Sequence, residues 1–167
     1  MNILPEYSVG FIGPLGAHKV SPRELRTELL SNLVSVEGIV TKLSLVRPKL
    51  VESVHYCAAT KKKLSRSHRD ETSLSGLPTA PTYPQSDENG NRLQTEFGLS
   101  TFKDYQTLYI QEMPERAPPG QLPRSVEAIV EDDLVDQVKP GDRVRMVGIY
   151  RAVPRNMGKG DNRSIFQ

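Results

Sequence analysis

The sequence predicts a mainly β protein whose strands surround one small core, with a polar insertion and a short N-terminal helix. Two observations support this prediction. Five short segments alternate between apolar and polar residues, as half-buried strands do. A long stretch between the second and third segments is polar and rich in proline and glycine, as surface insertions are.

The composition fits a small β protein. A length of 167 residues suits one domain with a small insertion. Hydrophobic residues make up 37% of the chain, beside 13 prolines and 12 glycines, so we expect a modest core and many turns. No apolar run is long enough to span a membrane, and the N-terminus lacks a secretory signal pattern. The single cysteine, Cys57, excludes an internal disulfide and indicates a reducing intracellular compartment.

The first expected element is a helix that begins near Ser21. This serine can cap the helix, Pro22 suits the first helical position, and Glu24 can complete a capping box. An apolar stripe follows at helical spacing, formed by Leu25, Leu29 and Leu30. The pattern predicts a short helix that ends at about Ser31.

Five strands are expected after this helix, over residues 33–41, 49–57, 105–113, 124–130 and 142–153. Gly38 interrupts the first strand, and a glycine there often marks a sharp bend at a barrel corner. These features favour a five-stranded OB-type barrel, while an SH3-like barrel or a small sandwich gives a similar pattern. The expected interior consists of Val36, Val40, Ile110, Val126, Val144 and Val147. Core positions are also favoured for Tyr105, Tyr109 and Tyr150.

The middle of the chain, residues 58–104, is expected to be an insertion with little core of its own. Within it, Asn89-Gly90 predicts a two-residue hairpin turn between "TYPQ" and "RLQTEFG". The other predicted parts are a helical segment over residues 1–32, the barrel over 33–57 and 105–154, and the truncated start of a basic hairpin over 155–167.

A net charge of +2 conceals strong segregation of charge along the chain. The stretch from Lys42 to Arg69 holds eight basic residues and one acid, and the stretch from Arg143 onward holds six and one. Between residues 127 and 136 lie five acids and no base, namely Glu127, Glu131, Asp132, Asp133 and Asp136. Segregated basic charge is typical of proteins with a polyanionic partner, although solvated strand faces give the same pattern.

The run "QEMPERAPPGQLPRSV" is continued by "DDLVD", "KPGDRV" and "GIYR". These motifs resemble the N-terminal region of the MCM (minichromosome maintenance) replicative helicase subunits, and the run is highly specific to that family. The segments "HKVSPREL", "VRPKLVESVHYC" and "TEFGLSTFKDYQT" look most like its third eukaryotic subunit. The resemblance extends over nearly the whole chain, from about Val9 to Pro154.

The resemblance implies a nuclear protein that contacts DNA mostly through phosphates and joins other MCM subunits in a hetero-hexameric ring. It also implies that the strand ending at Arg151 leads into a DNA-facing hairpin. Together with the basic charge, it predicts DNA contacts from Lys42, Arg47, Arg124, Arg143, Arg145, Arg151, Arg155, Lys159 and Arg163. The acidic segment of residues 127–136 repels phosphates, so it is expected to point outward or toward a neighbouring subunit, or to be an ordinary solvated turn.

Two features of MCM subunits are missing from the sequence. No Walker-type motif occurs, so this chain is not expected to be an enzyme, and the ATP and magnesium of the full-length family protein are not expected to bind it. Most MCM subunits also bind a structural zinc through two CxxC pairs, but Thr60 stands at the partner position of Cys57. Because only His55 and His68 could substitute, we expect a degenerate zinc-binding-like subdomain without metal, in which Cys57 packs as a small hydrophobic residue.

An alternative function is that of a purely structural module. In this interpretation the insertion and the helix hold neighbouring subunits together, and the chain makes no significant DNA contact of its own. Salt dependence distinguishes the two, because phosphate contacts weaken steeply as salt rises whereas apolar contacts do not.

Overall fold

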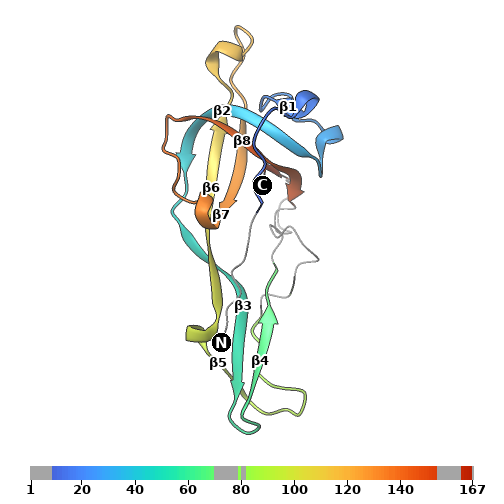
Figure 1. The fold of residues 1–167 in the computed structure, drawn as a ribbon, viewed down its shortest axis with the longest axis vertical. Helices are drawn as coiled ribbons and strands as arrows, with labels where there is room; N and C mark the ends of the chain where they lie inside the picture. The colour runs from blue at the N-terminus through green and yellow to red at the C-terminus, as the bar shows by residue number, and fades with distance from the viewer. Residues whose placement is uncertain (1–8, 70–78, 80–81, 154–162, 167) are drawn as a thin grey trace.

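The computed structural model describes residues 9–69, 79, 82–153 and 163–166. Within them, nine β-strands form one connected sheet (Figure 1). The strands are β1 (Lys19–Val20), β2 (Leu33–Leu43), β3 (Arg47–Cys57), β4 (Lys62–Ser67), β5 (Leu93–Thr95), β6 (Thr101–Gln111), β7 (Ser125–Glu131), β8 (Arg143–Val153) and β9 (Arg163–Phe166). Short 3₁₀ helices lie at Gly16–His18, Thr27–Leu29, Phe97–Leu99, Pro114–Arg116 and Asp132–Leu134. None of the helices in the described ranges is long and apolar enough to cross a membrane.

The molecule is elongated, with the barrel strands at one end and a narrow ribbon of β3 and β4 at the other (Figure 1). β3 belongs to both parts. Its residues 47–52 pair with β6, and its residues 52–57 pair with β4, while residues 55–57 also pair with β5. The insertion is therefore an extension of the barrel sheet, carried on a strand that begins in the barrel.

The strands around the core are linked by a circuit of pairings. It runs from β2 through β8, β9, β7 and β6 and returns to β2. Residues 33–39 of β2 pair antiparallel with β8, and residues 39–43 pair antiparallel with β6. The prediction of a mainly β protein is confirmed, and the five expected strands correspond to β2, β3, β6, β7 and β8.

The change of partner along β2 occurs at Ile39, directly after Gly38, where β6 passes at close range. A methyl group on Gly38 would lie 2.5 Å from the carbonyl oxygen of Gln111 and 2.5 Å from Cγ2 of Ile110. Atoms cannot approach that closely without overlap, so only glycine lets the two backbones lie together here. Gly38 thus permits the close approach of β6 at this position.

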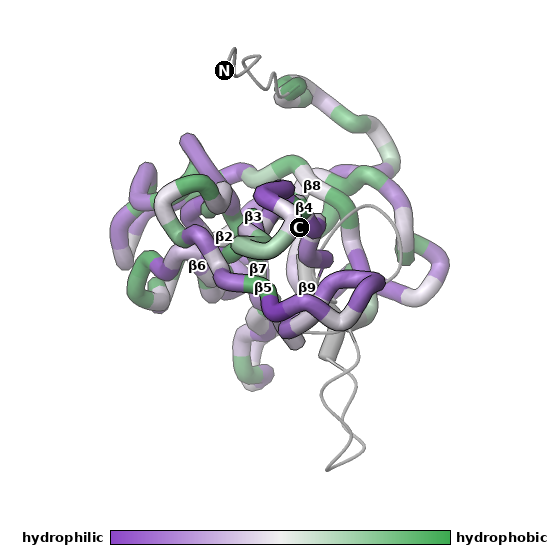
Figure 2. Tube along the Cα trace, turned by 90° about the horizontal axis from the view of Figure 1, so that it is seen from below, coloured by the Kyte–Doolittle hydropathy of each residue, from purple (hydrophilic) through white to green (hydrophobic). Residues whose placement is uncertain are grey.

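The core fills the space enclosed by these strands. Its buried residues are Val34, Val36, Leu108, Ile110, Val126, Ala128, Val130 and Tyr150. Hydrophobic and hydrophilic residues are interspersed along the described trace, as expected for strands with one buried face (Figure 2).

Of the six residues expected inside the barrel, Val147 is the one that was wrongly placed. Val144 and Met146 pack against the core, whereas Val147 is half-buried and lies opposite Ser35 of β2. The reason is the two-residue period of a strand, which prevents Val144 and Val147 from sharing a face.

The predicted N-terminal helix is also wrong. Its first turn exists, because the N–H of Ser21 donates to the Glu24 carboxylate at 2.7 Å and the N–H of Glu24 donates to the Ser21 carbonyl. The chain is then extended at Arg26, with φ −121° and ψ 166°, and only the 3₁₀ turn Thr27–Leu29 follows. An isolated helix of about ten residues is unstable in water, and here the leucines at 25, 29 and 30 pack on the barrel from an irregular backbone.

The turn in the insertion is longer than the predicted two-residue hairpin. Ser86 and Arg92 form an isolated antiparallel bridge that encloses residues 87–91. The carboxylate of Asp87 accepts hydrogen bonds from the N–H groups of Asn89 and Asn91, at 2.9 and 2.8 Å. This side chain organises a wider loop in which Gly90 adopts the expected positive φ of 79°.

We predict that Gly38→Ala lowers the free energy of unfolding by about 1–3 kcal/mol or more, because the added methyl group must displace backbone atoms of β6. The matched control is Gly98→Ala, since a Cβ at Gly98 meets nothing within 4 Å. Urea unfolding followed by circular dichroism measures both. Equal stabilities of the Gly38→Ala variant and the unmodified chain would contradict the close crossing.

Candidate nucleic-acid interface

A β-bulge in β2 turns Lys42 to the outside of the barrel. The register of β2 against β6 shifts at this point, so that Val40 lies opposite Ile110 and Lys42 lies opposite Tyr109. Strict alternation would have placed Lys42 on the same side as buried Val40. The extra residue leaves Lys42 exposed and allows Leu43 to pack against the core.

Tyr105 and Tyr109 lie on the outer face of β6 and are only partly buried, so the prediction that they belong to the core is wrong. Tyr150 is buried, as predicted. The sequence already indicated their position on the outer face. Tyr105 and Tyr109 are each an odd number of residues from buried Leu108, so in a strand their side chains face away from the core.

The ammonium group of a lysine lies over each of these two tyrosine rings. The ammonium of Lys42 lies 5.7 Å from the ring centroid of Tyr109, and that of Lys49 lies 5.7 Å from the ring centroid of Tyr105. In the ladder of β3 and β6, Arg47 lies opposite Tyr105 and Lys49 lies opposite Lys103, which places them on the same outer surface. We call this surface the β6 face, and it comprises Lys42, Arg47, Lys49, Lys103, Tyr105 and Tyr109.

Some cations of the β6 face are already matched by acids. Lys49 forms an ion pair with Glu131 at 2.8 Å, and Lys103 forms one with Asp132 at 3.3 Å. Two acids of the 127–136 segment thus balance lysines of the barrel. For Lys42 and Arg47, by contrast, no carboxylate partner is found among the residues that the structure describes.

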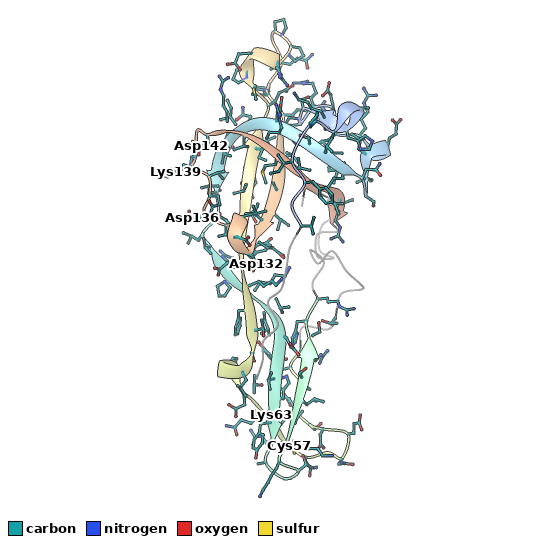
Figure 3. The ribbon with its side chains drawn as sticks, viewed as in Figure 1. Cys57, Lys63, Asp132, Asp136, Lys139 and Asp142 are labelled. Atoms are coloured by element: carbon teal, nitrogen blue, oxygen red, sulfur yellow. The ribbon has the colours of Figure 1, made fainter. Side chains whose placement is uncertain are left out.

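The exposed acids Asp133 and Asp136 of the same segment lie on the connection between β7 and β8. Figure 3 shows Asp132, Asp136, Lys139 and Asp142 along one side of the barrel, far from the tip of the β3–β4 ribbon. The acidic charge therefore covers one flank of the barrel end.

Arg145 is exposed, but its guanidinium group forms an ion pair with a buried carboxylate. The carboxylate of Glu37 is only 7% exposed and accepts from Nε of Arg145 at 2.6 Å, from Lys19 at 2.9 Å and from Arg116 at 2.9 Å. The hydrogen bond from Lys19 is the largest cause that lowers the pKa of Glu37 to about 2, with Arg145 adding to it and burial opposing it. This cluster ties β1 and β8 to β2.

Arg143 likewise donates to a carboxylate, that of Glu115, at 2.5 Å. Both of these groups are exposed, with side-chain exposures of 61% and 60%. Arg143 borders an open hollow of about 360 Å³ whose lining residues are Lys19, Glu37, Met113, Arg116, Arg143, Val144 and Arg145. Arg143 and Arg145, both predicted to contact DNA, thus form ion pairs within the chain.

The remaining predicted contacts are dispersed. Arg124 is exposed just before β7. Its backbone N–H donates to the carboxylate of buried Glu112, and its carbonyl accepts from the backbone N–H of Glu112. Arg151 lies on β8, and Arg163 begins β9, which pairs antiparallel with β8 and parallel with β7. Arg155 and Lys159 lie outside the described residues.

The residues considered for zinc do not form one site. His55 and His68 meet at Ser53, whose hydroxyl lies 2.8 and 2.7 Å from their Nε2 atoms, and burial lowers the pKa of both imidazoles. Cys57 is buried and instead contacts Asp87, with its Sγ 3.7 Å from the carboxylate. In the described part of the chain, no group of three or more His, Cys, Asp and Glu side chains could hold a metal ion. These residues therefore do not fit a structural zinc.

Comparison with known families assigns this arrangement to a class. The family model for the MCM OB domain matches residues 19–154. The chain therefore belongs to the MCM OB domain family, and this confirms both the OB-type barrel and the resemblance drawn from its motifs.

Curated relatives specify the branch of the family. The maternal DNA replication licensing factor mcm3 of Xenopus laevis is 63% identical over 153 residues, which cover 92% of this chain and 19% of that protein. DNA replication licensing factor MCM3 of Oryza sativa subsp. indica is 58% identical over 159 residues, covering 95% of this chain and 20% of that protein. That of Gallus gallus is 57% identical over 153 residues, covering 92% and 19%. The chain thus spans about a fifth of the length of these relatives.

The Glu37 cluster predicts a specific sensitivity to acid. Because the pKa of Glu37 is lower in the folded chain than its ordinary value of 4.5, its contribution to stability is complete above about pH 4.5 and is lost as the pH falls toward 2. Glu37→Gln should destabilise the chain at pH 7, and this deficit should shrink between pH 5 and pH 2.5. Urea unfolding across that pH range measures the difference.

The control for this prediction is Glu115→Gln, which removes an exposed carboxylate that is also paired with an arginine. Exposed pairs contribute little, so this variant should stay close to the unmodified chain. A stability deficit of Glu37→Gln that remains constant from pH 7 to pH 2.5 would contradict the proposed charge balance.

Proposed function

We propose that this chain is the DNA-contacting and ring-assembly part of an MCM subunit that acts in replication licensing, initiation and fork unwinding. The proposal is supported by family membership and by relatives whose names describe DNA replication licensing factors. In this proposal the whole protein works in the nucleus beside other MCM subunits. ATP and magnesium are bound by other parts of that protein.

The observation that supports DNA contact most directly is the position of the β6 face. OB barrels bind oligonucleotides across the face of their second and third strands and on the adjacent loops. Here those strands are β3 and β6, and Arg47, Lys49 and the two outer tyrosines lie on that face. Lys42 extends the same surface onto β2.

The two loops at this end of the barrel differ in charge. The connection from β2 to β3, residues 44–46, is flanked by Lys42 and Arg47 and exposes Leu45. The connection from β7 to β8 carries Asp132, Asp133 and Asp136, which repel phosphates. DNA should therefore run along the β2–β3 side of this end of the barrel.

The rings of the β6 face are not open platforms for base stacking, because Lys42 and Lys49 lie over them. Binding should then depend on phosphates, tolerate any base sequence and weaken as salt rises.

We predict that Lys42→Ala/Arg47→Ala weakens binding of a labelled single-stranded oligonucleotide. Each lost phosphate contact reduces the slope of log K against log salt by roughly 0.7, so the double variant should flatten it by about 1.4. Fluorescence anisotropy of the complete 167-residue chain across a salt series measures both effects.

The matched control is Arg26→Ala/Lys139→Ala, which removes two exposed cations outside the β6 face. It should leave the slope within the error of the unmodified chain. If the β6-face variant keeps the full affinity and slope, phosphate binding at this face is excluded. If the unmodified chain also fails to bind, the purely structural module becomes the better account.

Apolar side chains at the start of β6 support the assembly part of the proposal. Phe97, Leu99 and Phe102 are 64%, 47% and 46% exposed and lie within six residues of one another. Exposed apolar groups of this kind favour burial in a contact between proteins. We assign this contact to a neighbouring MCM subunit.

We predict that Phe97→Ser/Phe102→Ser lowers the incorporation of the full-length subunit into rings reconstituted with the other MCM subunits. Size-exclusion chromatography with light scattering measures ring content. DNA binding of the 167-residue chain should stay unchanged, because these side chains are not part of the β6 face. Unchanged ring content in this variant would exclude the apolar cluster from the subunit contact.

A further inference from the structure

The far end of the β3–β4 ribbon is strongly basic and lies well away from the barrel. β3 and β4 are joined by a turn in which Lys61 adopts a positive φ of 55°. Figure 3 places Lys63 and Cys57 at this end, far from Lys139 on the barrel. Tyr56 is nine residues from Arg47 along β3, which corresponds to about 30 Å at roughly 3.3 Å per residue.

The cations at this tip are not balanced by neighbouring acids. Lys61, Lys62 and Lys63 are exposed, and within the described ranges none of them has a carboxylate partner. The nearest loop carries two acids, the exposed Glu88 and Asp87, whose carboxylate accepts hydrogen bonds from Asn89 and Asn91 and contacts the Cys57 thiol. The three lysines and Arg92 outnumber these two acids, so the tip has a net positive charge.

An aromatic ring shares one face of the ribbon with part of this charge. Tyr56 lies opposite Lys63 on one side and opposite Gln94 on the other. Lys62 lies opposite buried Cys57, so it projects from the other face. Tyr56 is only partly buried, since the opposite face of β3 is the one that packs.

A shallow hollow of about 550 Å³ adjoins this ring. It is lined by Tyr56, Ala58, Arg92, Leu93, Gln94 and Thr95. The hollow thus combines a phenol ring, a guanidinium group and an amide, and Lys63 lies opposite Tyr56 in the strand pairing. Proteins that bind single-stranded nucleic acid join basic charge to aromatic rings in this way.

We propose that this tip is a second DNA-binding surface, in which Lys61, Lys63 and Arg92 contact phosphates and Tyr56 stacks on an unpaired base. The proposal rests on the proposed function, since it assumes that the chain binds DNA. The tip surface differs from the β6 face in one respect, because no cation lies over the ring of Tyr56 among the described contacts. The tip therefore selects strands with unpaired bases, whereas the β6 face recognises only phosphates.

Because the two surfaces are far apart, the affinity for single-stranded DNA should depend on the length of the strand. A stacked strand that advances 3.4 Å per nucleotide needs roughly nine nucleotides to span about 30 Å, and an unstacked single strand, which extends further per nucleotide, needs fewer. A 20-nucleotide strand can bind both surfaces at once and gains affinity from the linkage, whereas a 6-nucleotide strand reaches both only near full extension and should bind more weakly.

The test uses the complete chain with fluorescein-labelled oligo(dT) of 6 and 20 nucleotides and a 20-base-pair duplex. Lys61→Ala/Lys63→Ala/Arg92→Ala should flatten the salt slope for the 20-nucleotide strand by about 2, at roughly 0.7 for each phosphate contact. Tyr56→Leu should weaken binding of the 20-nucleotide strand about 5-fold or more, and Tyr56→Phe should restore it, because stacking requires only the ring. Neither Tyr56 variant should change duplex binding.

Lys62→Ala is the matched control for charge, because this lysine projects from the opposite face of the ribbon. In this variant the slope of log K against log salt for the 20-nucleotide strand should change by less than about 0.7. If the triple tip variant binds like the unmodified chain while Lys42→Ala/Arg47→Ala does not, the tip proposal is wrong and the β6 face stands. If the triple variant loses slope but Tyr56→Leu has no effect, base stacking is wrong. If the unmodified chain binds none of the three probes, the proposed function itself fails.

Discussion

The close passage of β6 over Gly38 is the constraint on which the rest of the structure depends. It lets one strand, β2, pair first with β8 and then with β6, and so brings the last part of the chain against its middle. The connection between β7 and β8 bonds to the same place, since the N–H of Gly141 donates to the Val40 carbonyl at 2.7 Å and the N–H of Val40 donates to the Asp142 carbonyl at 2.9 Å. A side chain at position 38 would separate these three elements.

The same region determines which charges remain available. The bulge just after the crossing turns Lys42 outward, and the buried carboxylate of Glu37 just before it engages Lys19, Arg116 and Arg145. A basic residue in the sequence can therefore hold the barrel together or offer its charge to a partner. Lys42 and Arg47 belong to the second class, and Arg145 belongs to the first.

Much of the fold followed from alternation, because the barrel strands have one buried and one exposed face. Gly38, within the first of them, lies where β6 passes at close range. The strand β4 was missed because its exposed "KKLSRS" shows no such alternation, and its pairing depends on β3 alone. The predicted helix was wrong because Ser21 and Glu24 specify only one turn. The backbone after this turn is determined by the tertiary contacts of the following leucines with the core.

The candidate site was less predictable, because charge in the sequence does not show which acid lies beside which base. Arg145 and Glu37 are far apart along the chain, and only the register of β2 and β8 makes them neighbours. The outward position of Lys42 depends on a bulge that strict alternation cannot reveal. The tyrosines of β6 could have been placed correctly, since their spacing from Leu108 already assigned them to the outer face.

The central claim is that the basic face on β2, β3 and β6 contacts DNA while the acidic flank does not. Hydrogen–deuterium exchange of the complete chain, with and without a saturating 20-nucleotide single strand, tests it directly. The account predicts slower exchange of backbone amides over residues 42–49 and 103–109, and unchanged exchange over residues 132–142. Protection confined to residues 132–142, or no protection at residues 42–49 with DNA bound, would contradict it.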